Sequence, residues 1–496
     1  MPNIKSVSCS NNLSTSNRST AHAIEVSDIP LALYIHIPWC VKKCPYCDFN
    51  SHELPIDSQL SMYEEYVDAL LRDAAMQLVL TQGREISSIF IGGGTPSLLP
   101  ILQYQRLFNR LREIFKFAND IEVTMEANPG TLEHAPFAEY LDVGINRLSI
   151  GVQSFSAEQL ITLGRIHDPK QALSAIKAAR TAGFERVNVD LMHGLPGQTM
   201  SEALNDIQMA HDAGATHISW YQLTIEPNTV FYRSQPILPD EDRLADIEES
   251  GQTLLQNLGY HNYEVSAWSG ALDKPCRHNV NYWQFGDYLA IGAGAHGKVT
   301  VGESFSDEAV TNDVVTDEVL DNKEIVSKSS TNELTKNELT NNEELKEAGI
   351  YRFSKSRMPK DYMGYQDIIQ GNAGQNNTGQ NNTGQNNANQ NTAFQKNEIS
   401  QQNEAPIEAL TEVPKMVGWQ AIASDELVSE FMLNALRLHD GVAWSLFEAR
   451  TGLSYGSIAT QVNKLIQQGL LMDNVEKLQP TVLGKRYLNQ ILREFL

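Results

Sequence analysis

Short runs of β-branched and other apolar residues alternate along the chain with longer stretches of helical spacing. The short runs, which we expect to form strands, are residues 31–37, 88–91, 121–125, 147–152, 186–191 and 217–223. The longer stretches, which we expect to form helices, include residues 63–80, 104–115, 170–182 and 201–213. Parallel strands need a long crossover connection, so this alternation favours β-α-β units and a parallel sheet. The pattern predicts an α/β fold, either an open sheet or a full or partial barrel, with the chemistry in the loops that follow the strands.

The last part of the chain has a different pattern, typical of a winged helix. Helical stretches at 426–438, 443–450 and 455–468 precede a predicted hairpin at 471–481. Residues 424–496 carry seven basic and eight acidic side chains. Because DNA-binding domains usually show a basic surplus, we expect a packing or lid role for this domain.

Two polar segments interrupt the apolar pattern. Residues 301–350 contain 13 acidic and four basic side chains, and from Gly374 onward the sequence GQNNT occurs twice, followed by GQNNA. Such segments bury too little apolar surface to offset the entropy of ordering them. The predicted organisation is a disordered tail at 1–29, a folded core at 30–300, an acidic disordered insertion at 301–348, a return segment of the core at 349–370, a Gln/Asn-rich disordered insertion at 371–412 and a C-terminal domain at 413–496.

Composition narrows the class of protein. The 496 residues include 61 acids and 38 bases, a net charge of -23, which argues against nucleic acid or an anionic membrane as a partner. No apolar run approaches the roughly 18 residues of a membrane-spanning helix. Five cysteines are too few and too unevenly spaced for a disulfide framework. We expect a cytoplasmic protein without a membrane span.

Three of the five cysteines lie in one loop after the first predicted strand. Cys40, Cys44 and Cys47 have the spacing C-x3-C-x2-C. Thiolates are the preferred ligands of iron-sulfur clusters, and three of them can hold a 4Fe-4S cluster while one iron stays open for an exchangeable ligand. The alternative is a zinc site that His52 or His36 completes. The C-x3-C-x2-C spacing resembles that of the radical S-adenosylmethionine (SAM) superfamily, in which SAM chelates the open iron.

Glycine and polar residues occupy the ends of the next strands. Gly92-Gly93-Gly94-Thr95-Pro96 follows the second strand, and glycines allow a ligand to approach the backbone closely, although a tight turn explains them equally well. Later strand ends bring polar residues, each of which has a helix cap or an internal salt bridge as its alternative role. These residues are Glu126, Gln153, Arg165 and Asp190.

The motifs YIHIPWC, CPYCDF, GGGTPS, EANPG, GVQSF and DLMHGLPGQT together resemble the family of the oxygen-independent coproporphyrinogen III dehydrogenases (oxidases). The resemblance covers residues 31–298, 350–363 and the C-terminal domain. It implies a partial parallel (β/α)6 barrel of the TIM type with a small winged-helix-like α+β domain, and a 4Fe-4S cluster on Cys40, Cys44 and Cys47. It also implies a SAM site, whose residues would be Tyr34, Gly93, Gly94, Thr95, Glu126, Gln153, Arg165 and Asp190.

Within this family the chain is most similar to the heme chaperone branch, HemW. The dehydrogenases carry a further cysteine two places after the third ligand, where this chain has Phe49. They also have a longer ordered N-terminal segment. In addition, residues 278–283 (HNVNYW) match the H-N-x-x-Y-W motif of the chaperone branch.

That motif implies a heme site at His278, Asn279, Tyr282 and Trp283. A neutral imidazole is a good axial ligand of heme iron, and aromatic rings offer flat apolar surface to the macrocycle. By composition alone, a core aromatic pair beside a surface histidine explains the motif as well. Cys276 is a competing thiolate ligand and His296 a second candidate histidine.

Two functions from different classes therefore compete. The first is a heme chaperone with a cluster and exchangeable SAM, which passes heme to an unknown acceptor protein. The second is a radical SAM dehydrogenase that converts coproporphyrinogen III. A third possibility is a scaffold that has kept only a relic of the cluster site.

Overall fold

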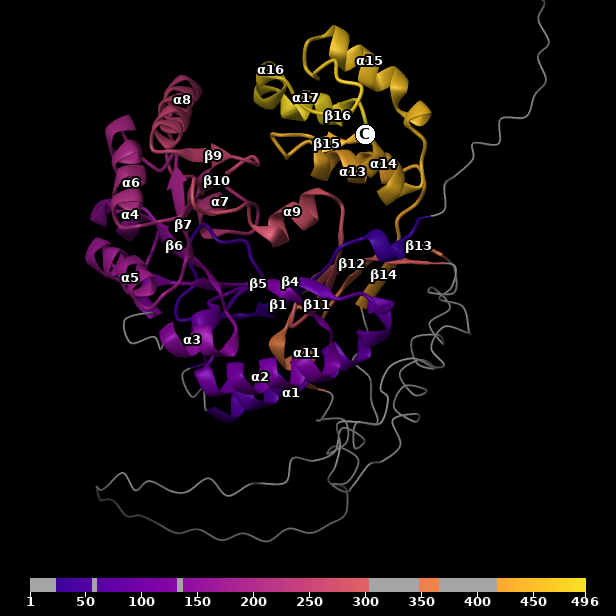
Figure 1. The fold of residues 1–496 in the computed structure, drawn as a ribbon. Coiled ribbons are helices and arrows are strands. Elements are labelled where there is room, and N and C mark those ends of the chain that lie inside the picture. Colours follow the sequence, from indigo (N-terminus) through magenta and orange to yellow (C-terminus); the bar gives the residue numbers. More distant parts are fainter. Residues whose placement is uncertain (1–23, 56–59, 132–136, 303–347, 365–416) are drawn as a thin grey trace, which may run out of the picture. The chain divides into compact units, whose positions relative to one another are not determined.

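The computed structural model describes residues 24–55, 60–131, 137–302, 348–364 and 417–496 (Figure 1). They form two compact units, one consisting of Val26–Ala423 and the other including Ser424–Leu496. Most of the predicted tail and of the two predicted insertions lies outside the described residues. None of the helices in the described part is both long and apolar enough to cross a membrane.

Twelve of the fourteen described strands of the first unit form one sheet, in the order β14-β13-β12-β11-β1-β4-β5-β6-β7-β8-β10-β9. Six successive strands in its middle run parallel to one another. They are β1 (Leu31–Ile37), β4 (Ile86–Gly93), β5 (Phe117–Ala127), β6 (Arg147–Gln153), β7 (Arg186–His193) and β8 (His217–Gln222). The predicted α/β class, with a partial (β/α)6 barrel and a separate C-terminal domain, is confirmed.

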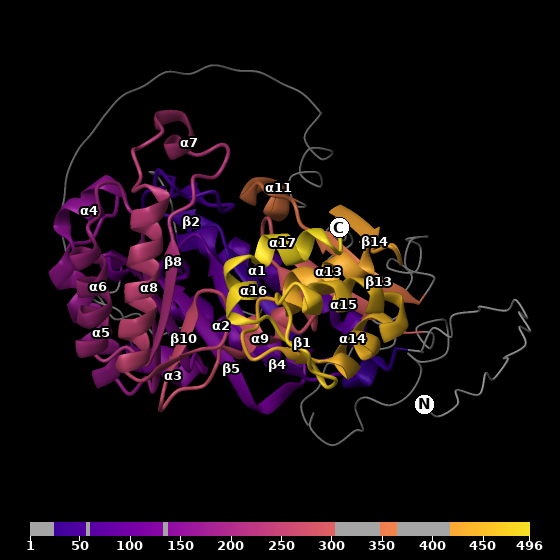
Figure 2. The same ribbon diagram turned by 90° about the horizontal axis from the view of Figure 1, so that it is seen from above.

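Helices connect the parallel strands and lie on the outer face of the curved sheet (Figures 1 and 2). They are α1 (Leu60–Met76), α2 (Ile101–Ile114), α3 (Phe137–Val143), α4 (Ala157–Thr162), α5 (Pro169–Thr181) and α6 (Met200–Asp212). After β8, α7 (Val230–Ser234) and α8 (Glu241–Asn257) follow, and α8 packs against α6. Sequence periodicity predicted four of these helices and missed α3, α4, α7 and α8.

The two faces of the parallel sheet differ in chemistry because successive side chains of a strand point to opposite sides. In β6, Leu148, Ile150 and Val152 belong to the apolar core that the helices cover. The intervening Arg147 and Ser149 hydrogen-bond to side chains of neighbouring strands. The inner face of the barrel is therefore polar, unlike the apolar filling of a closed TIM barrel.

Further strands extend the sheet at both edges. Beyond β8 lie β10 (Ala267–Gly270) and β9 (Tyr260–Asn262), both antiparallel to their neighbours. Beyond β1 lies β11 (Asp287–Ile291), which is parallel to β1. The antiparallel strands β12 (His296–Val301), β13 (Gly349–Ser354) and β14 (Val417–Ala421) complete that edge.

This edge corrects one predicted domain boundary. We expected the C-terminal domain to begin at residue 413, but β14 pairs with β13 and so belongs to the sheet of the first unit. The second unit begins at Ser424. The strand β13, which pairs with β12, is followed by α11 (Pro359–Met363). Pairing between strands so far apart in sequence leaves no local trace, which is why periodicity placed the boundary too early.

The second unit is a small α+β domain with α13 (Leu427–Ala435), α14 (Trp444–Thr451), α15 (Ala459–Gln467), α16 (Val482–Arg486) and α17 (Leu488–Arg493). Phe431 and Phe447 are buried in its core, with their rings edge to face. The predicted hairpin at 471–481 is only partly correct. It contains the bridge Leu471–Pro480, but β16 (Lys477–Leu478) pairs with the more distant β15 (Val442–Ala443).

Candidate functional site

Polar side chains near the carboxyl ends of the parallel strands are held by hydrogen bonds inside the barrel. Glu126 on β5 accepts a hydrogen bond from the backbone N–H of Gly93 at 3.2 Å. Asp190 on β7 is held by Asn188 and Ser149, at 2.8 and 3.0 Å. The charge of Asp190 acts on the carboxyl group of Glu126, as expected of side chains on the same inner face of the sheet.

Burial makes these carboxyl groups reluctant to ionise. Burial and, secondly, the charge of Asp190 raise the pKa of Glu126 to about 8. Burial also raises the pKa of Asp190, although its hydrogen bonds offset part of the effect. Tyr34 on β1 is half-buried. Desolvation and, secondly, the charge of Glu126 raise the pKa of its phenol well above the usual value. A positive charge nearby would stabilise the ionised form of these carboxyl groups, and a cationic ligand would supply it.

The three-cysteine loop follows β1. It connects β2 (Trp39–Cys40) to β3 (His52–Glu53), two short strands that pair in parallel. Lys43 pins the loop through hydrogen bonds from its ammonium group to the carbonyls of Phe49 and Ser51, at 3.0 and 3.1 Å. Cys40, Cys44 and Cys47 are all free thiols at the half-buried level.

The thiols have polar neighbours. Burial raises the pKa values of Cys40 and Cys47, and a hydrogen bond with Ser51 offsets part of this for both. A hydrogen bond between Thr95 and Cys40 acts in the same direction. Arg165 donates from Nη1 to Sγ of Cys44 at 3.5 Å. The structure thus brings two predicted SAM residues, Thr95 and Arg165, to two of the three cysteines.

The glycine turn after β4 lies between the loop and the interior. A Cβ atom at Gly94 would come within 2.5 Å of the Trp39 carbonyl oxygen, so a side chain there would push the cysteine loop away. Gly93 has a φ of +114°, and a Cβ there would lie within 2.6 Å of the His36 ring. Both positions therefore require glycine, for conformation and for the close approach of the loop.

Gln153 and Arg165 lie at the end of β6 and beyond it. Gln153 has a φ of +71°, an uncommon conformation for a residue with a side chain, and accepts a hydrogen bond from the Tyr221 hydroxyl at 2.8 Å. Arg165 donates from Nη2 to the carbonyl of Gly151 at 2.6 Å. Strained backbone of this kind is frequent at ligand sites. Of the eight predicted SAM residues, Gly93, Glu126 and Gln153 lie at the carboxyl ends of β4, β5 and β6, and Gly94 and Thr95 follow β4 directly. Tyr34 and Asp190 lie within β1 and β7, and Arg165 lies beyond α4.

Within the described ranges, no three His, Cys, Asp or Glu side chains converge as the ligands of one metal ion would. The ligands of a 4Fe-4S cluster bind to separate irons, so they need not converge on one point. The two histidines of the zinc alternative have other partners. His36 hydrogen-bonds to the Tyr34 hydroxyl and to the Asn50 carbonyl, and His52 to the carbonyl of Arg357.

The predicted heme motif forms α9 (Arg277–Trp283). The half-buried ring of His278 stacks on Phe90 of β4 at 4.8 Å between centroids and lies 6.3 Å from the ring of Tyr34. Burial lowers the pKa of His278 to about 4, so its imidazole is neutral at pH 7. Its Nδ1 atom is buried without a hydrogen-bond partner. The structure therefore places the predicted axial ligand beside a predicted SAM residue, which the sequence did not indicate.

The rest of the motif lies around the same helix. Tyr282 is 36% exposed and packs edge to face on Trp283, with 4.9 Å between their centroids. Asn279 and Trp283 are half-buried. Their roles toward heme remain predictions.

The two competing ligands differ in accessibility. Cys276 is buried, and burial raises the pKa of its thiol to about 12, so it stays protonated and enclosed. This makes it a poor thiolate ligand. His296 is exposed at the start of β12.

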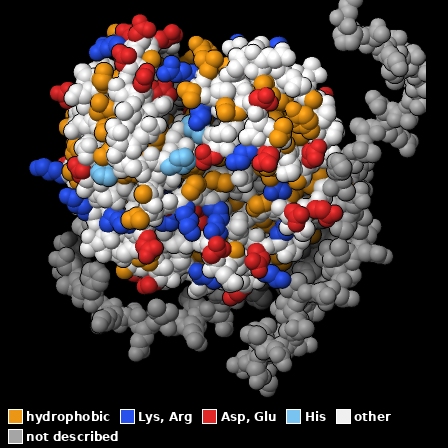
Figure 3. Space-filling view, turned by 45° about the horizontal axis from the view of Figure 1, so that its top comes forward, with side chains coloured by type: hydrophobic (Ala, Val, Ile, Leu, Met, Phe, Trp, Pro, Cys, Tyr) orange, Lys and Arg blue, Asp and Glu red, His pale blue; other side chains and the backbone are white. Residues whose placement is uncertain are grey.

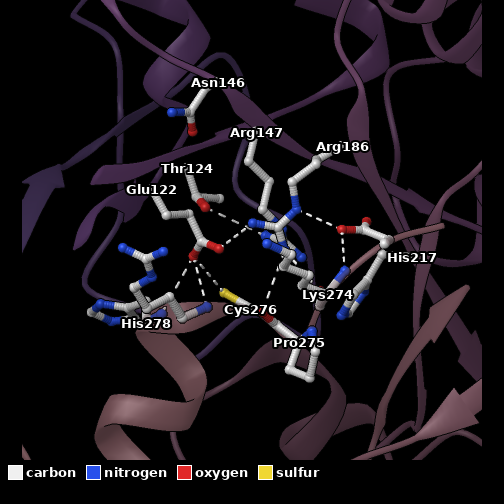
Figure 4. A network of polar contacts seen from close by, with 12 residues as sticks. Glu122, Thr124, Asn146, Arg147, Arg186, His217, Lys274, Pro275, Cys276 and His278 are labelled. Carbon is white, nitrogen blue, oxygen red and sulfur yellow. Dashed lines mark hydrogen bonds and ion pairs between the residues drawn. The ribbon is translucent and has the colours of Figure 1, made fainter. Parts of the chain in front are cut away.

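Sequence reasoning missed a second, deeper group of residues inside the barrel. Glu122, Arg147 and Arg186 come from β5, β6 and β7, and His217 at the start of β8 lies nearby (Figure 4). Glu122 and Arg186 bond to each other and to the backbone of the segment before α9 and of its first residue. The sequence feature that could have indicated this group is the polar residue at every second position of these strands. Strand register was needed to show that they meet.

Two family models match the chain. Residues 34–210 match the radical SAM superfamily, and residues 422–487 match the HemN C-terminal domain. A solved structure titled "Coproporphyrinogen III oxidase (HemN) from Escherichia coli is a Radical SAM enzyme" has a TM-score of 0.65 at 19% identity, and the match covers 95% of this chain and 90% of that one. At this identity the likeness concerns the fold alone.

Curated relatives are similar over nearly the whole chain. The sequence is 40% identical over 470 residues to the "Heme chaperone HemW" of Escherichia coli (strain K12), covering 94% of this chain and 98% of the relative. It is 39% identical over 471 residues to the protein of the same name from Haemophilus influenzae, with the same coverage.

Proposed function

The chain belongs to the HemW family of radical SAM proteins, and from this premise we propose that it binds heme and transfers it to an acceptor protein. It would carry a 4Fe-4S cluster on Cys40, Cys44 and Cys47, with SAM as an exchangeable ligand. The observation that carries the proposal is the position of His278, a neutral imidazole whose ring lies 6.3 Å from that of Tyr34.

The residues around the cysteine loop fit a cluster and SAM. Three free thiols on one loop are the expected donor set, and bound SAM would supply the fourth-iron ligand and a positive charge. Burial raises the pKa values of Glu126 and Asp190, and the positive charge of SAM would favour their ionised forms. Gly93 and Gly94 leave room for the ligand beside the backbone.

The residues of α9 fit heme in part. A ring whose pKa is about 4 does not compete with a proton for iron at neutral pH. Tyr282 presents an exposed ring for contact with the macrocycle. In this conformation the ring of His278 is stacked on Phe90. Coordination therefore requires either that the heme iron approaches the stacked imidazole or that the imidazole rotates away from Phe90.

The proposal includes a heme acceptor but no nucleic acid. The chain carries a net charge of -23, and acidic and basic side chains lie side by side on the face drawn in Figure 3. Free thiols at Cys40, Cys44, Cys47 and Cys276 suit a reducing compartment, and we expect the protein to work in the cytoplasm.

Hemin binding tests the proposed ligand. The anaerobically reconstituted protein would be titrated with hemin, and its absorption and magnetic circular dichroism compared with those of His278→Ala and His296→Ala. We expect His278→Ala to lose the histidine-ligated signature and to bind about tenfold more weakly or worse, a difference of about 1.4 kcal/mol. His296→Ala should match the unchanged protein. An unaltered spectrum in His278→Ala would reject His278 as the ligand.

The alternative function is a coproporphyrinogen III dehydrogenase. Phe49 replaces the additional cysteine of that branch and is 62% exposed beside the cluster loop. We expect the reconstituted protein with SAM and a reductant to leave coproporphyrinogen III unchanged. Formation of protoporphyrinogen IX, measured by chromatography, would refute a purely chaperone role.

A further inference from the structure

A buried carboxylate inside the barrel holds the beginning of α9. Glu122 of β5 is 4% exposed, and its Oε1 accepts hydrogen bonds from the backbone N–H of Arg277 at 2.8 Å and of His278 at 3.4 Å. The thiol of Cys276 donates to the same oxygen at 3.5 Å. Figure 4 shows these contacts converging on Glu122 from one side.

The other carboxylate oxygen of Glu122 faces positive charge. Arg186 of β7 donates to it from Nη1, and the same guanidinium bonds to Asp273 at 2.5 Å. Burial by itself would raise the pKa of Glu122, but the charges of Arg147 and Arg186 and the N–H of Arg277 outweigh it and lower the pKa. The acceptor at the start of α9 is therefore an anion fixed to the wall of the barrel.

Helix α9 needs such an outside acceptor. The first amides of a helix have no partner within it, and a helix of only seven residues is too short to be stable alone. Cys276 occupies the capping position but makes no capping hydrogen bond with its side chain. Glu122 supplies the missing acceptor from another element, and its negative charge also suits the positive end of the helix dipole.

We propose that Glu122 is the positioning residue of the heme ligand: by binding the amides of Arg277 and His278, it fixes the start of α9 and thereby the ring of His278. This inference rests on the proposed function. Because Glu122 acts through the backbone of His278, it does not touch heme itself.

A second carboxylate provides a matched control. Asp120 is two residues earlier on the same strand and also binds Arg277, but through the guanidinium group, at 2.8 Å. Its side chain is 79% exposed. Asp120→Asn removes a negative charge from the same strand and the same partner residue without freeing the amides of α9.

The test compares Glu122→Ala, Glu122→Gln, Asp120→Asn and His278→Ala in the full-length, anaerobically reconstituted chain. The readouts are the hemin-bound spectrum, hemin affinity, SAM affinity, and hydrogen exchange of the Arg277 and His278 amides. We expect Glu122→Ala to expose both amides to exchange and to weaken hemin binding about tenfold, as loss of a helix cap would. Like His278→Ala, it should also lose the histidine-ligated signature of the hemin spectrum. Asp120→Asn should change none of these.

Both Glu122 variants remove the charge that faces Arg147 and Arg186. Glu122→Gln nevertheless keeps an oxygen acceptor and the side-chain volume at the same place, so it tests the proposal if Glu122→Ala does not fold. We expect it to protect the α9 amides partly and to bind hemin with an affinity between those of the unchanged protein and His278→Ala. If His278→Ala alters the hemin spectrum while both Glu122 variants leave spectrum and exchange unchanged, the positioning role is wrong. If His278→Ala has no effect, the heme proposal fails, whereas faster exchange in the Glu122 variants would still show that Glu122 holds α9.

Discussion

Glu126 is the residue whose ionisation depends most directly on the proposed ligand. Without a ligand its pKa is about 8, so at pH 7 it is mostly protonated. The sulfonium charge of SAM favours the carboxylate, so binding at pH 7 should release close to one proton, and affinity should fall as the pH falls below 8.

Calorimetry in buffers of different ionisation enthalpy measures this proton directly. We expect Glu126→Gln to abolish the buffer dependence while leaving the cluster in place. Equal heats in all buffers for the unchanged protein would contradict the assignment of Glu126 to the SAM site.

Arg165 contacts a proposed cluster ligand as well as belonging to the proposed SAM site. Its guanidinium donates to Sγ of Cys44 at 3.5 Å, and hydrogen bonds to cluster sulfurs stabilise the more negative, reduced state. In the absence of SAM, Arg165→Met should therefore shift the reduction potential of the cluster to a more negative value. An EPR-monitored redox titration measures the shift, with Lys42→Met, an exposed residue of the same loop, as the control. Identical potentials would show that Arg165 does not act on the cluster.

Spacing alone was enough to propose the cysteines, because a short loop keeps residues that are close in sequence close in space. It was not enough for Glu122 or Arg186. Both lie in strands whose polar alternation is visible in the sequence, but their contact depends on register across β5, β6 and β7. The orientation of His278 toward Tyr34 was beyond sequence reasoning for the same reason, because α9 and β1 are far apart along the chain.

At the level of elements, continuous apolar runs marked the parallel strands well. The predicted range 31–37 coincides with β1. The helix α8 was missed because it buries only Ile247, Gly251 and Leu255, which form a narrow stripe with a glycine at its centre. Such a stripe gives a weak periodic signal.

That glycine yields a prediction about stability. A Cβ atom at Gly251 would lie 2.1 Å from Cη2 of Trp220, so α8 approaches β8 only because the side chain is absent. Gly→Ala within a helix usually stabilises by about 1 kcal/mol, but here we expect overpacking to destabilise by about 1–3 kcal/mol. Urea unfolding measures the difference. Gly364→Ala, which meets nothing within 4 Å, is the control, and a stabilised Gly251→Ala would contradict the packing.

At the level of the whole molecule, the sheet pairs two strands that are separated in the sequence by the acidic segment. In the pairing of β12 with β13, Val301 lies opposite Gly349, so the two ends of the acidic segment are neighbours. Its removal should therefore leave the sheet intact. We expect replacement of residues 303–347 by a two-residue Asn-Gly turn to preserve the melting temperature and hemin affinity. Loss of hemin affinity with an unchanged melting temperature would assign a binding role to the replaced residues.

The sequence predicted the middle of this sheet and not its edges. Six strands follow one another with helices between them, so their order could be inferred from the chain. The parallel pairing of β11 with β1 joins residues more than 250 positions apart. The local sequence of β11, β13 and β14 does not indicate which strands they pair with. The domain boundary was misplaced for that reason.

In the proposed function, three thiolates hold a 4Fe-4S cluster whose fourth iron is open to SAM. Mössbauer spectroscopy of the 57Fe-reconstituted chain, recorded under anaerobic conditions with and without SAM, tests it most directly. We predict the spectrum of a 4Fe-4S cluster in which one iron site changes its parameters when SAM is added. A chain that takes up zinc or no metal at these cysteines, or a cluster that SAM leaves unchanged, would contradict the account.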